Sequence, residues 1–427
     1  MITPLLGIID TAVLTRAGTT ADIAGVALAG AVFSLLYWSL GFLRMSLAGL
    51  VAQADGAADE AGVRAHLVQG VAIGFSVGLL LLLLRMPIAD LSGTLMARGS
   101  NTSEDALAAM QSYIHIRLLA APFAIAFFAG IGWLTGQGRV GLMMGVIVFV
   151  TLTNAVLDIY FVMGLGMGVE GIALGTAIAE GVGALLMGAV ILFVLMRRGG
   201  VRRDWVPARM RENLKGVLAL NADIFIRTFS LAVVFAYFTR AGGQFGDLTV
   251  AANQVLMHLL LSAGLLLDGP AIAAETMVGK ALGSYSDKSR RLQEAVRSTA
   301  ALAAVAAVAM TIALFILGKP ILNLIAPDGG ASADLHAEAW RYYVWAAISP
   351  LMMVGPFQMD GIYIGATRGA ALRNSMVGAC LLFAFGVWLL VPLMGNHGLW
   401  LSFGFFMAGR AAFLALAWRG FAKLTAA

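Results

Sequence analysis

The chain has few charged residues. Asp, Glu, Lys and Arg make up 12% of its 427 residues, against about 25% in soluble globular proteins. This shortage excludes an ordinary water-soluble fold. Hydrophobic residues make up 60%, and the apolar runs are roughly 20 residues long and continuous rather than alternating, which predicts membrane-spanning helices rather than a barrel.

Cysteine and histidine are also scarce. Cys380 is the only cysteine, which excludes an intrachain disulfide and a thiolate metal cluster. The five histidines are scattered without metal-ligand spacing, and no nucleophile stands beside a base. No Walker motif is present, so ATP is not the expected energy source. We therefore expect a protein that is not an enzyme and that has no metal and no cofactor.

Apolar blocks between polar breaks predict about twelve spans. Their approximate cores are 2–17, 27–54, 64–86, 107–134, 140–163, 169–196, 214–239, 249–282, 295–318, 338–365, 370–394 and 398–419. The fold class predicted is therefore an all-α integral membrane protein with the lipid bilayer as its main partner.

Lys and Arg fall mostly on one side of these spans, above all in 197–215 and 280–297. The positive-inside rule places that side in the cytoplasm. Both termini are then cytoplasmic, and the location expected is a bacterial cytoplasmic (inner) membrane. The excess of Lys and Arg over Asp and Glu is explained by this membrane topology, so no nucleic-acid partner is expected.

An internal repeat relates the two halves of the chain. The tetrapeptide TRAG begins at Thr15 and again at Thr239, "GLVAQADG" (49–56) aligns with "TMVGKALG" (276–283), and "GQGR" aligns with "GATR" at nearly the same offset. Such parallel repeats are typical of transporters with a substrate path between the halves. We expect two pseudo-symmetric six-helix lobes, residues 1–200 and 214–427, joined by a basic cytoplasmic linker, 201–213.

Several stretches carry a family resemblance along nearly the whole chain. They are "PLLGIIDTAV", "FLRMSLAGLVAQA", "GQGR", "NAVLDIYFVMGLGMGVEGIALGTAIAE", "NADIFIRT", "AAETMVGKALG" and "QMDGIYIGATRGAALRNSM". The chain resembles the multidrug and toxic compound extrusion (MATE) family in its DinF-like branch. The resemblance implies twelve helices in two lobes around a central cavity. It also implies export of amphipathic, often cationic, drug-like small molecules by antiport with H⁺ or Na⁺, H⁺ being favoured by the branch. We expect a monomer.

The first predicted helix is short for a membrane span. It has about 17 residues, or roughly 25 Å, against a hydrocarbon core of about 30 Å. Members of the resembling family have more residues ahead of "PLLGIID". We therefore expect that the functional protein begins upstream of Met1.

Acidic residues inside spans need an explanation, because a charge at the bilayer centre costs at least about 2.5–3.5 kcal/mol. They are Asp10, Asp158, Glu180, Asp223, Asp268, Glu275 and Asp360. Asn154 and Asp158 are four residues apart and share one helix face, so the amide can hydrogen-bond the carboxyl. A buried carboxyl favours its neutral form, which suits it to proton coupling, while a static interhelical bond is the alternative.

The resemblance assigns a proton or cation site in the N-terminal lobe to an Asp on helix 1 and an Asn-x-x-x-Asp on helix 5. Asp10, Asn154 and Asp158 match these positions. In the family, bending of helix 1 accompanies protonation, and Pro4 is the candidate for that bend, because proline kinks helices. Its other interpretation is the start of the helix.

In the C-terminal lobe, Asp223 and Arg227 are spaced for a structural ion pair on one helix. The resemblance makes Asp360 a candidate for the C-lobe cavity, with helix packing as the alternative. Asp268 and Glu275 are further cavity candidates, which lie near a helix break predicted at Gly269-Pro270.

Two other transport functions remain as alternatives to drug export. A lipid-linked sugar or polysaccharide flippase of the wider superfamily would favour several cationic residues in its cavity. Here the intramembrane acids outnumber the bases, which favours a cationic cargo or protons. A passive channel is disfavoured because two repeated lobes are suited to alternating access.

Overall fold

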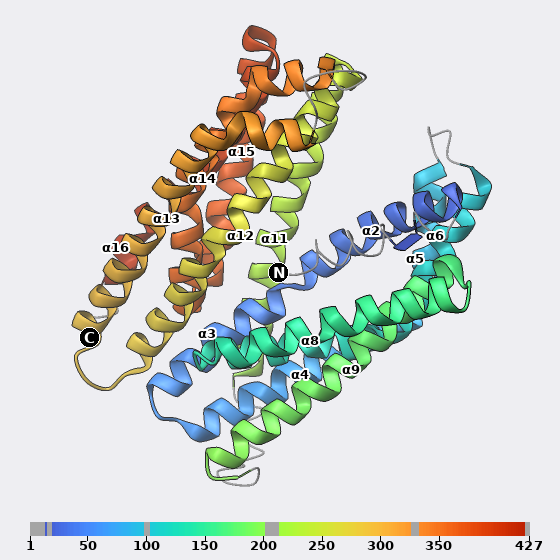
Figure 1. Ribbon diagram of the computed structural model, residues 1–427. Coiled ribbons are helices and arrows are strands. Elements are labelled where there is room, and N and C mark those ends of the chain that lie inside the picture. Colours follow the sequence, from blue (N-terminus) through green and yellow to red (C-terminus); the bar gives the residue numbers. More distant parts are fainter. Residues whose placement is uncertain (1–12, 15–18, 98–102, 201–212, 326–332, 423–427) are drawn as a thin grey trace. The chain divides into compact units, whose positions relative to one another are not determined.

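The computed structural model describes residues 13–14, 19–97, 103–200, 213–325 and 333–422 of the chain (Figure 1). Every regular element in these ranges is a helix, as the composition predicts. The chain divides into two compact units. One contains Met1–Val51 and Asp59–Leu214, and the other contains Ala52–Ala58 and Lys215–Ala427.

The helices of the first unit begin and end at recognisable sequence signals. Thr19 caps α2 in a capping box, since its hydroxyl accepts from the Asp22 amide and the Asp22 carboxylate accepts from the Thr19 amide. Asp59 caps α4 in a similar way by accepting from the Gly62 amide. The helices are α2 (Thr20–Leu40), α3 (Phe42–Gly56), whose residues from Ala52 onward belong to the second unit, α4 (Glu60–Leu83), α5 (Arg85–Ala97), α6 (Glu104–Arg117), α7 (Ala121–Gly136), α8 (Val140–Asp158) and α9 (Gly168–Arg197).

Two interruptions in this unit break the regular α-helical pattern. A 3₁₀ turn, η1 (Leu118–Ala120), joins α6 to α7, where Pro122 lies in the first turn of α7. A π-helical segment, η2 (Ile159–Gly164), continues α8 directly after Asp158. Single π turns inside helices occur frequently at functional sites.

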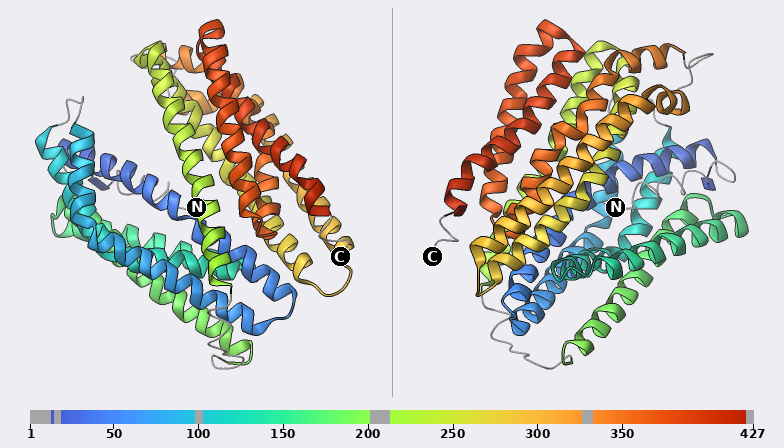
Figure 2. Two further views of the ribbon diagram at one scale, coloured as in Figure 1. Left: turned by 180° about the vertical axis from the view of Figure 1, so that it is seen from behind. Right: turned by 60° about the vertical axis from the view of Figure 1, so that its left-hand side comes forward.

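The second unit is built of long helices. They are α11 (Leu214–Gly242), the 3₁₀ turn η3 (Gly243–Phe245), α12 (Asp247–Gly283), α13 (Lys288–Ile325), α14 (Ala333–Gly365), α15 (Gly369–Met394) and α16 (Asn396–Ala422). Both Figures 1 and 2 show α12, α13 and α14 running side by side. The prediction of a helix break at Gly269-Pro270 is wrong, because α12 continues without interruption through Pro270. Long membrane helices tolerate a proline where neighbours compensate for the lost backbone bond.

The predicted spans from 27–54 onward all fall on helices, and ten helices in the described ranges are long and apolar enough to cross a membrane. The first predicted span lies outside the described residues, apart from Val13 and Leu14. Helix α14 is long but is not among the ten. It buries many of its residues, including Ser349, Gln358 and Asp360, against neighbouring helices.

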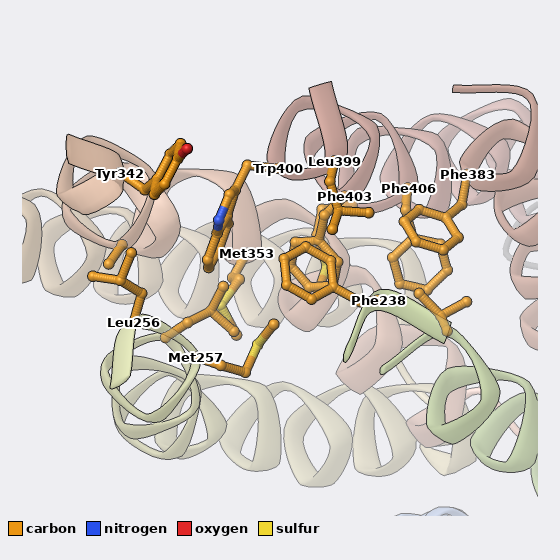
Figure 3. Close-up of a cluster of buried hydrophobic side chains, with 14 of the residues drawn as sticks. Phe238, Leu256, Met257, Tyr342, Met353, Phe383, Leu399, Trp400, Phe403 and Phe406 are labelled. Carbon is orange, nitrogen blue, oxygen red and sulfur yellow. The ribbon is translucent and has the colours of Figure 1, made fainter. Parts of the chain in front are cut away.

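Aromatic packing forms the core of the second unit (Figure 3). Phe238 of α11 meets Trp400 of α16 edge to face, with ring centroids 4.9 Å apart, and Phe403 lies 5.7 Å from Phe238. Contacts of this kind contribute about 0.5–1.5 kcal/mol each beyond the area they bury. They fix α16 against α11 and thereby place Arg410, further along α16, in the interior of the unit.

Candidate functional site

Asn154 and Asp158 are fully buried on α8 and are hydrogen-bonded to each other. The Asn154 amide nitrogen donates to Asp158 Oδ1 at 3.3 Å and to Thr176 Oγ1 of α9 at 3.1 Å. Thr176 in turn donates to the carbonyl of Ile172. The amide is therefore held between two helices, and it holds the carboxyl of Asp158 in place. No spacing along the chain indicates Thr176 as a partner, because it lies on another helix.

The backbone of α9 shapes the same site. A Cβ atom added at Gly175 would lie 2.4 Å from Asp158 Oδ1, so only glycine allows α9 to approach the carboxyl this closely. Asp158 is also the last residue of α8 before the π-helical segment η2. The carboxyl of Asp158 thus lies where α8 changes from α-helical to π-helical geometry, and it packs against the side-chain-free backbone of Gly175 on α9. Asp10 and Pro4, the other two residues assigned to this site, lie outside the described residues.

The ion pair expected between Asp223 and Arg227 does not form. Arg227 pairs with Asp360 of α14, and Asp223 pairs with Arg373 of α15. The two side chains start on one face of α11 but diverge. Arg227 is buried and requires a buried partner, whereas Asp223 lies against Gly369 at the start of α15.

Asp360 is shared by two arginines. Its Oδ2 atom accepts from Arg227 and, at 2.6 Å, from Arg410 Nη2 of α16. All three side chains are buried. This cluster joins α11, α14 and α16, which is the geometry of the helix-packing alternative for Asp360; its role in a cavity stays a prediction. Arg410 had no assigned role in the sequence, although an unexplained base in a span signals an acidic partner.

Asp268 and Glu275 both lie on α12. Glu275 is buried, while Asp268 is partly exposed. The backbone of Glu275 is closely packed, since a Cβ atom added at Gly365 of α14 would lie 2.3 Å from the Glu275 carbonyl oxygen. Their assignment to a cavity remains a prediction.

A second acid inside a predicted span of the first unit, Glu180, is partly buried and was given no role by the sequence. Glu180 of α9 accepts from Arg117 Nη2 of α6 at 3.1 Å and from the Tyr37 hydroxyl of α2 at 3.4 Å. Glu180 is four residues after Thr176, so it lies on the same face of α9 as the site of Asp158.

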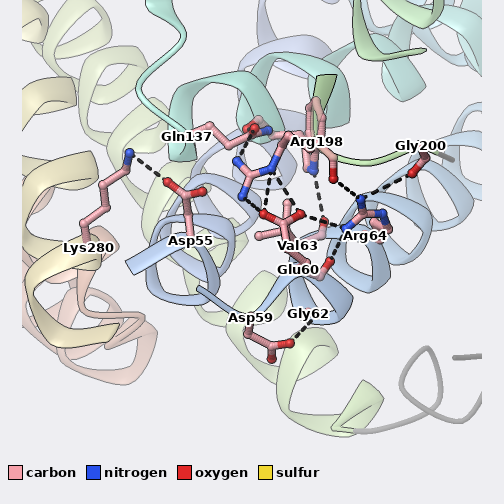
Figure 4. A network of polar contacts seen from close by, with 11 residues as sticks. Asp55, Asp59, Glu60, Gly62, Val63, Arg64, Gln137, Arg198, Gly200 and Lys280 are labelled. Atoms are coloured by element: carbon pink, nitrogen blue, oxygen red, sulfur yellow. Dashed lines mark hydrogen bonds and ion pairs between the residues drawn. The ribbon is translucent and has the colours of Figure 1, made fainter. Parts of the chain in front are cut away.

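Charged side chains also tie together the helix ends of the first unit (Figure 4). Glu60, at the start of α4, pairs with Arg64 at 2.7 Å and with Arg198, which follows α9. Arg198 also donates to Gln137 at 2.9 Å, and Arg64 donates to the carbonyls of Arg198 and Gly200. This cluster of Glu60, Arg64, Gln137 and Arg198 lies on the side that the charge distribution predicts to be cytoplasmic.

Comparison with known proteins identifies the family. The sequence profile described as MatE matches residues 1–160 and 224–388. The chain belongs to the MATE family. It is therefore a multi-pass membrane protein from a family of transporters. Members of this family are not enzymes, which agrees with the expectation from the sequence.

Relatives of this MATE chain span most of its length. DNA damage-inducible protein F of Escherichia coli strain K12 is 35% identical over 97% of this chain and 88% of that protein. A probable multidrug resistance protein NorM of Deinococcus radiodurans is 27% identical over 95% of this chain and 89% of that relative. The first of these confirms the resemblance to the DinF-like branch.

Solved structures show the same fold. A structure titled "Crystal structure of MATE in the bent conformation" has a TM-score of 0.83 and 20% identity, covering 99% of this MATE chain and 91% of that one. An outward-facing multidrug resistance MATE family transporter has a TM-score of 0.83 and 18% identity, covering 100% and 92%. The predicted MATE fold is confirmed.

Proposed function

We propose that this MATE transporter exports amphipathic organic cations across a bacterial inner membrane, with both termini in the cytoplasm, and that inward proton flow drives the export. The observation that carries the proposal is the buried carboxyl of Asp158, held by the amide of Asn154. Further support comes from relatives named as multidrug exporters, such as multidrug export protein MepA of Staphylococcus aureus strain N315, 23% identical over 72% of this chain and 66% of that protein.

The neutral amide suits Asp158 to a change of protonation. An amide nitrogen donates to a carboxylate and equally to the carbonyl oxygen of the protonated acid, so Asn154 can hold the group in both states. Protonation removes a buried charge and lowers the cost of burial. The carboxylate form can hold a cationic cargo, and the protonated form releases it.

The membrane potential supplies enough energy for this exchange. One elementary charge moving through 100 mV gains about 2.3 kcal/mol. A bias of that size shifts a two-state equilibrium by more than tenfold. Exchange at Asp158 can therefore favour one of two packings of the first unit.

Transport in proteoliposomes tests the proposal. Wild-type protein is reconstituted with a fluorescent organic cation such as ethidium, and proton and sodium gradients are imposed separately. A proton gradient alone is expected to drive uptake or efflux of the dye. Transport that follows only the sodium gradient would contradict proton coupling. Movement of a lipid-linked sugar without any movement of organic cations would replace the proposal with the flippase alternative.

A further inference from the structure

Three aromatic rings surround the guanidinium of Arg117 inside the first unit. Its Cζ atom lies 4.3 Å from the ring centroid of Phe33, 5.2 Å from Tyr37 and 5.9 Å from Tyr113. The rings support one another edge to face, with centroids 5.3 Å apart for Phe33 and Tyr37 and 5.8 Å apart for Phe33 and Tyr113. Rings fixed in this way present preformed faces to a cation.

A carboxylate completes the enclosure. Glu180 Oε1 accepts from Arg117 Nη2, and the hydroxyl of Tyr37 donates to the other oxygen of Glu180. Aromatic faces together with one acid are the groups that recognise organic cations such as quaternary ammonium compounds. We call the set of Phe33, Tyr37, Tyr113 and Glu180 the aromatic enclosure.

The groups of the enclosure accept only some of the hydrogen bonds that the guanidinium of Arg117 can donate. Arg117 donates to Glu180 and, at 3.2 Å, to the hydroxyl of Tyr113. Its buried Nε atom has no hydrogen-bond partner among the residues that the structure describes. A guanidinium has five N–H donors, and a buried donor without a partner costs about 1–3 kcal/mol. The enclosure is thus better suited to a cation that carries few N–H groups.

The backbone at Arg117 lies at an interruption between helices. Arg117 is the last residue of α6, and the 3₁₀ turn η1 and Pro122 follow it. Proline supplies no backbone N–H, so helical hydrogen bonding is interrupted there. The side chain of Arg117 is already 11% exposed. A long arginine side chain at such a point can extend toward a polar boundary while its stem stays in apolar surroundings.

We propose that the aromatic enclosure is a binding site for organic cations, and that Arg117 occupies it until a cationic ligand displaces the guanidinium. One monovalent cation then replaces another beside Glu180, so the site remains neutral. Glu180, the residue that α9 contributes to the enclosure, lies one helical turn from Thr176, which accepts a hydrogen bond from Asn154. The proposed ligand site and the proposed proton site therefore lie on the same face of α9. This inference rests on the proposed function, because it names a site for the exported cargo.

Choline and its uncharged carbon isostere, 3,3-dimethyl-1-butanol, provide a matched pair of probes. Binding is measured by calorimetry on the full chain in lipid nanodiscs, and ligand-dependent thermal stability is measured in parallel. Arg117→Gln is expected to bind choline at least about ten times more tightly than wild type does, because the competing guanidinium of Arg117 is gone. Choline should also raise the melting temperature of Arg117→Gln by more than that of wild type.

The double variant Arg117→Gln/Glu180→Gln leaves no unpaired charge in the enclosure. It is expected to fold and to lose the gain in choline affinity. Arg290→Gln, at an exposed position on α13, should match wild type, and the uncharged isostere should not distinguish the variants. Arg117→Gln binding choline no more tightly than wild type would overturn the site, as would the double variant binding as tightly as Arg117→Gln.

Failure of this site and failure of the proposed function give different results. If wild type transports ethidium with a proton gradient but the two enclosure variants bind choline as wild type does, only the site is wrong. If the enclosure binds choline as expected but no gradient drives cation transport, the site stands and the proposed function fails.

Discussion

Arg227 of α11 pairs with Asp360 of α14, 133 positions further along the chain, rather than with Asp223 one turn away on its own helix. Asp360 is the common acceptor for Arg227 and Arg410, both of which are buried. The acid therefore stabilises three helices of the second unit at one point.

This arrangement predicts unequal effects of two Asp→Asn changes. Asp360→Asn leaves two buried guanidinium groups without their carboxylate and should lower the free energy of unfolding by roughly 3–5 kcal/mol. Asp223→Asn should cost about 1 kcal/mol or less, because Arg373 is 36% exposed and remains hydrated. Thermal unfolding of the purified variants checks the difference. Equal losses of stability would contradict the assignment of Asp360 as the shared partner.

The cluster at the helix ends of the first unit predicts a second effect on stability. Glu60→Gln removes the carboxylate that pairs with Arg64 and Arg198, and should cost about 1.5–3 kcal/mol. Glu294→Gln is the matched control, since its i,i+4 partner Arg290 is exposed and exposed pairs contribute little. A melting temperature equally unchanged in both variants would show that the cluster does not stabilise the unit.

Close packing at Asp158 predicts that a single methyl group disturbs the site. Gly175→Ala places a Cβ atom against Asp158 Oδ1 and should lower proton-driven transport by at least about tenfold, because small misplacements of a reacting group are costly. Gly181→Ala on the same helix places its Cβ more than 4 Å from every atom of the described residues outside its own turn of helix and should transport as wild type does. Membrane levels of both variants are compared by immunoblot. Normal transport by Gly175→Ala would show that the position of Asp158 is not critical.

The predicted topology places the two ends of α12 on opposite sides of the membrane. In a Cys380→Ala background, Ser286→Cys after α12 should be protected from a membrane-impermeant thiol reagent in intact cells, since the 280–297 region is rich in Lys and Arg. Gln244→Cys, in the turn before α12, should be labelled. Both side chains are exposed. The reverse labelling pattern would invert the topology.

Most of what the sequence predicts correctly about the fold follows from its hydrophobic pattern. Continuous apolar runs located the helices from residue 27 onward, because lipid requires each span to satisfy its own backbone hydrogen bonds. Local breaks were harder to predict. Gly269-Pro270 does not interrupt α12, whereas η2 forms without any proline or other strong breaker before it. Contacts between neighbouring helices decide such cases.

Pairing between polar side chains could be predicted only in part, and only where both residues lie on one helix. The spacing of Asn154 and Asp158 gave their hydrogen bond correctly, since both residues lie on α8. The same rule failed for Asp223 and Arg227, because a buried arginine takes the acid that packing places beside it. The partners of Glu180 and Asp360 lie on other helices, and no spacing along the chain indicates them.

Asp158→Asn tests the proposed coupling most directly, because asparagine mimics the protonated acid at nearly constant shape. Wild-type and variant protein are reconstituted in proteoliposomes, and ethidium transport is followed under an imposed proton gradient, with thermal stability as the control for folding. We predict that Asp158→Asn folds with nearly wild-type stability but transports no dye in response to the gradient. Proton-driven transport at the wild-type rate would contradict the mechanism and leave Asp158 with only a structural role.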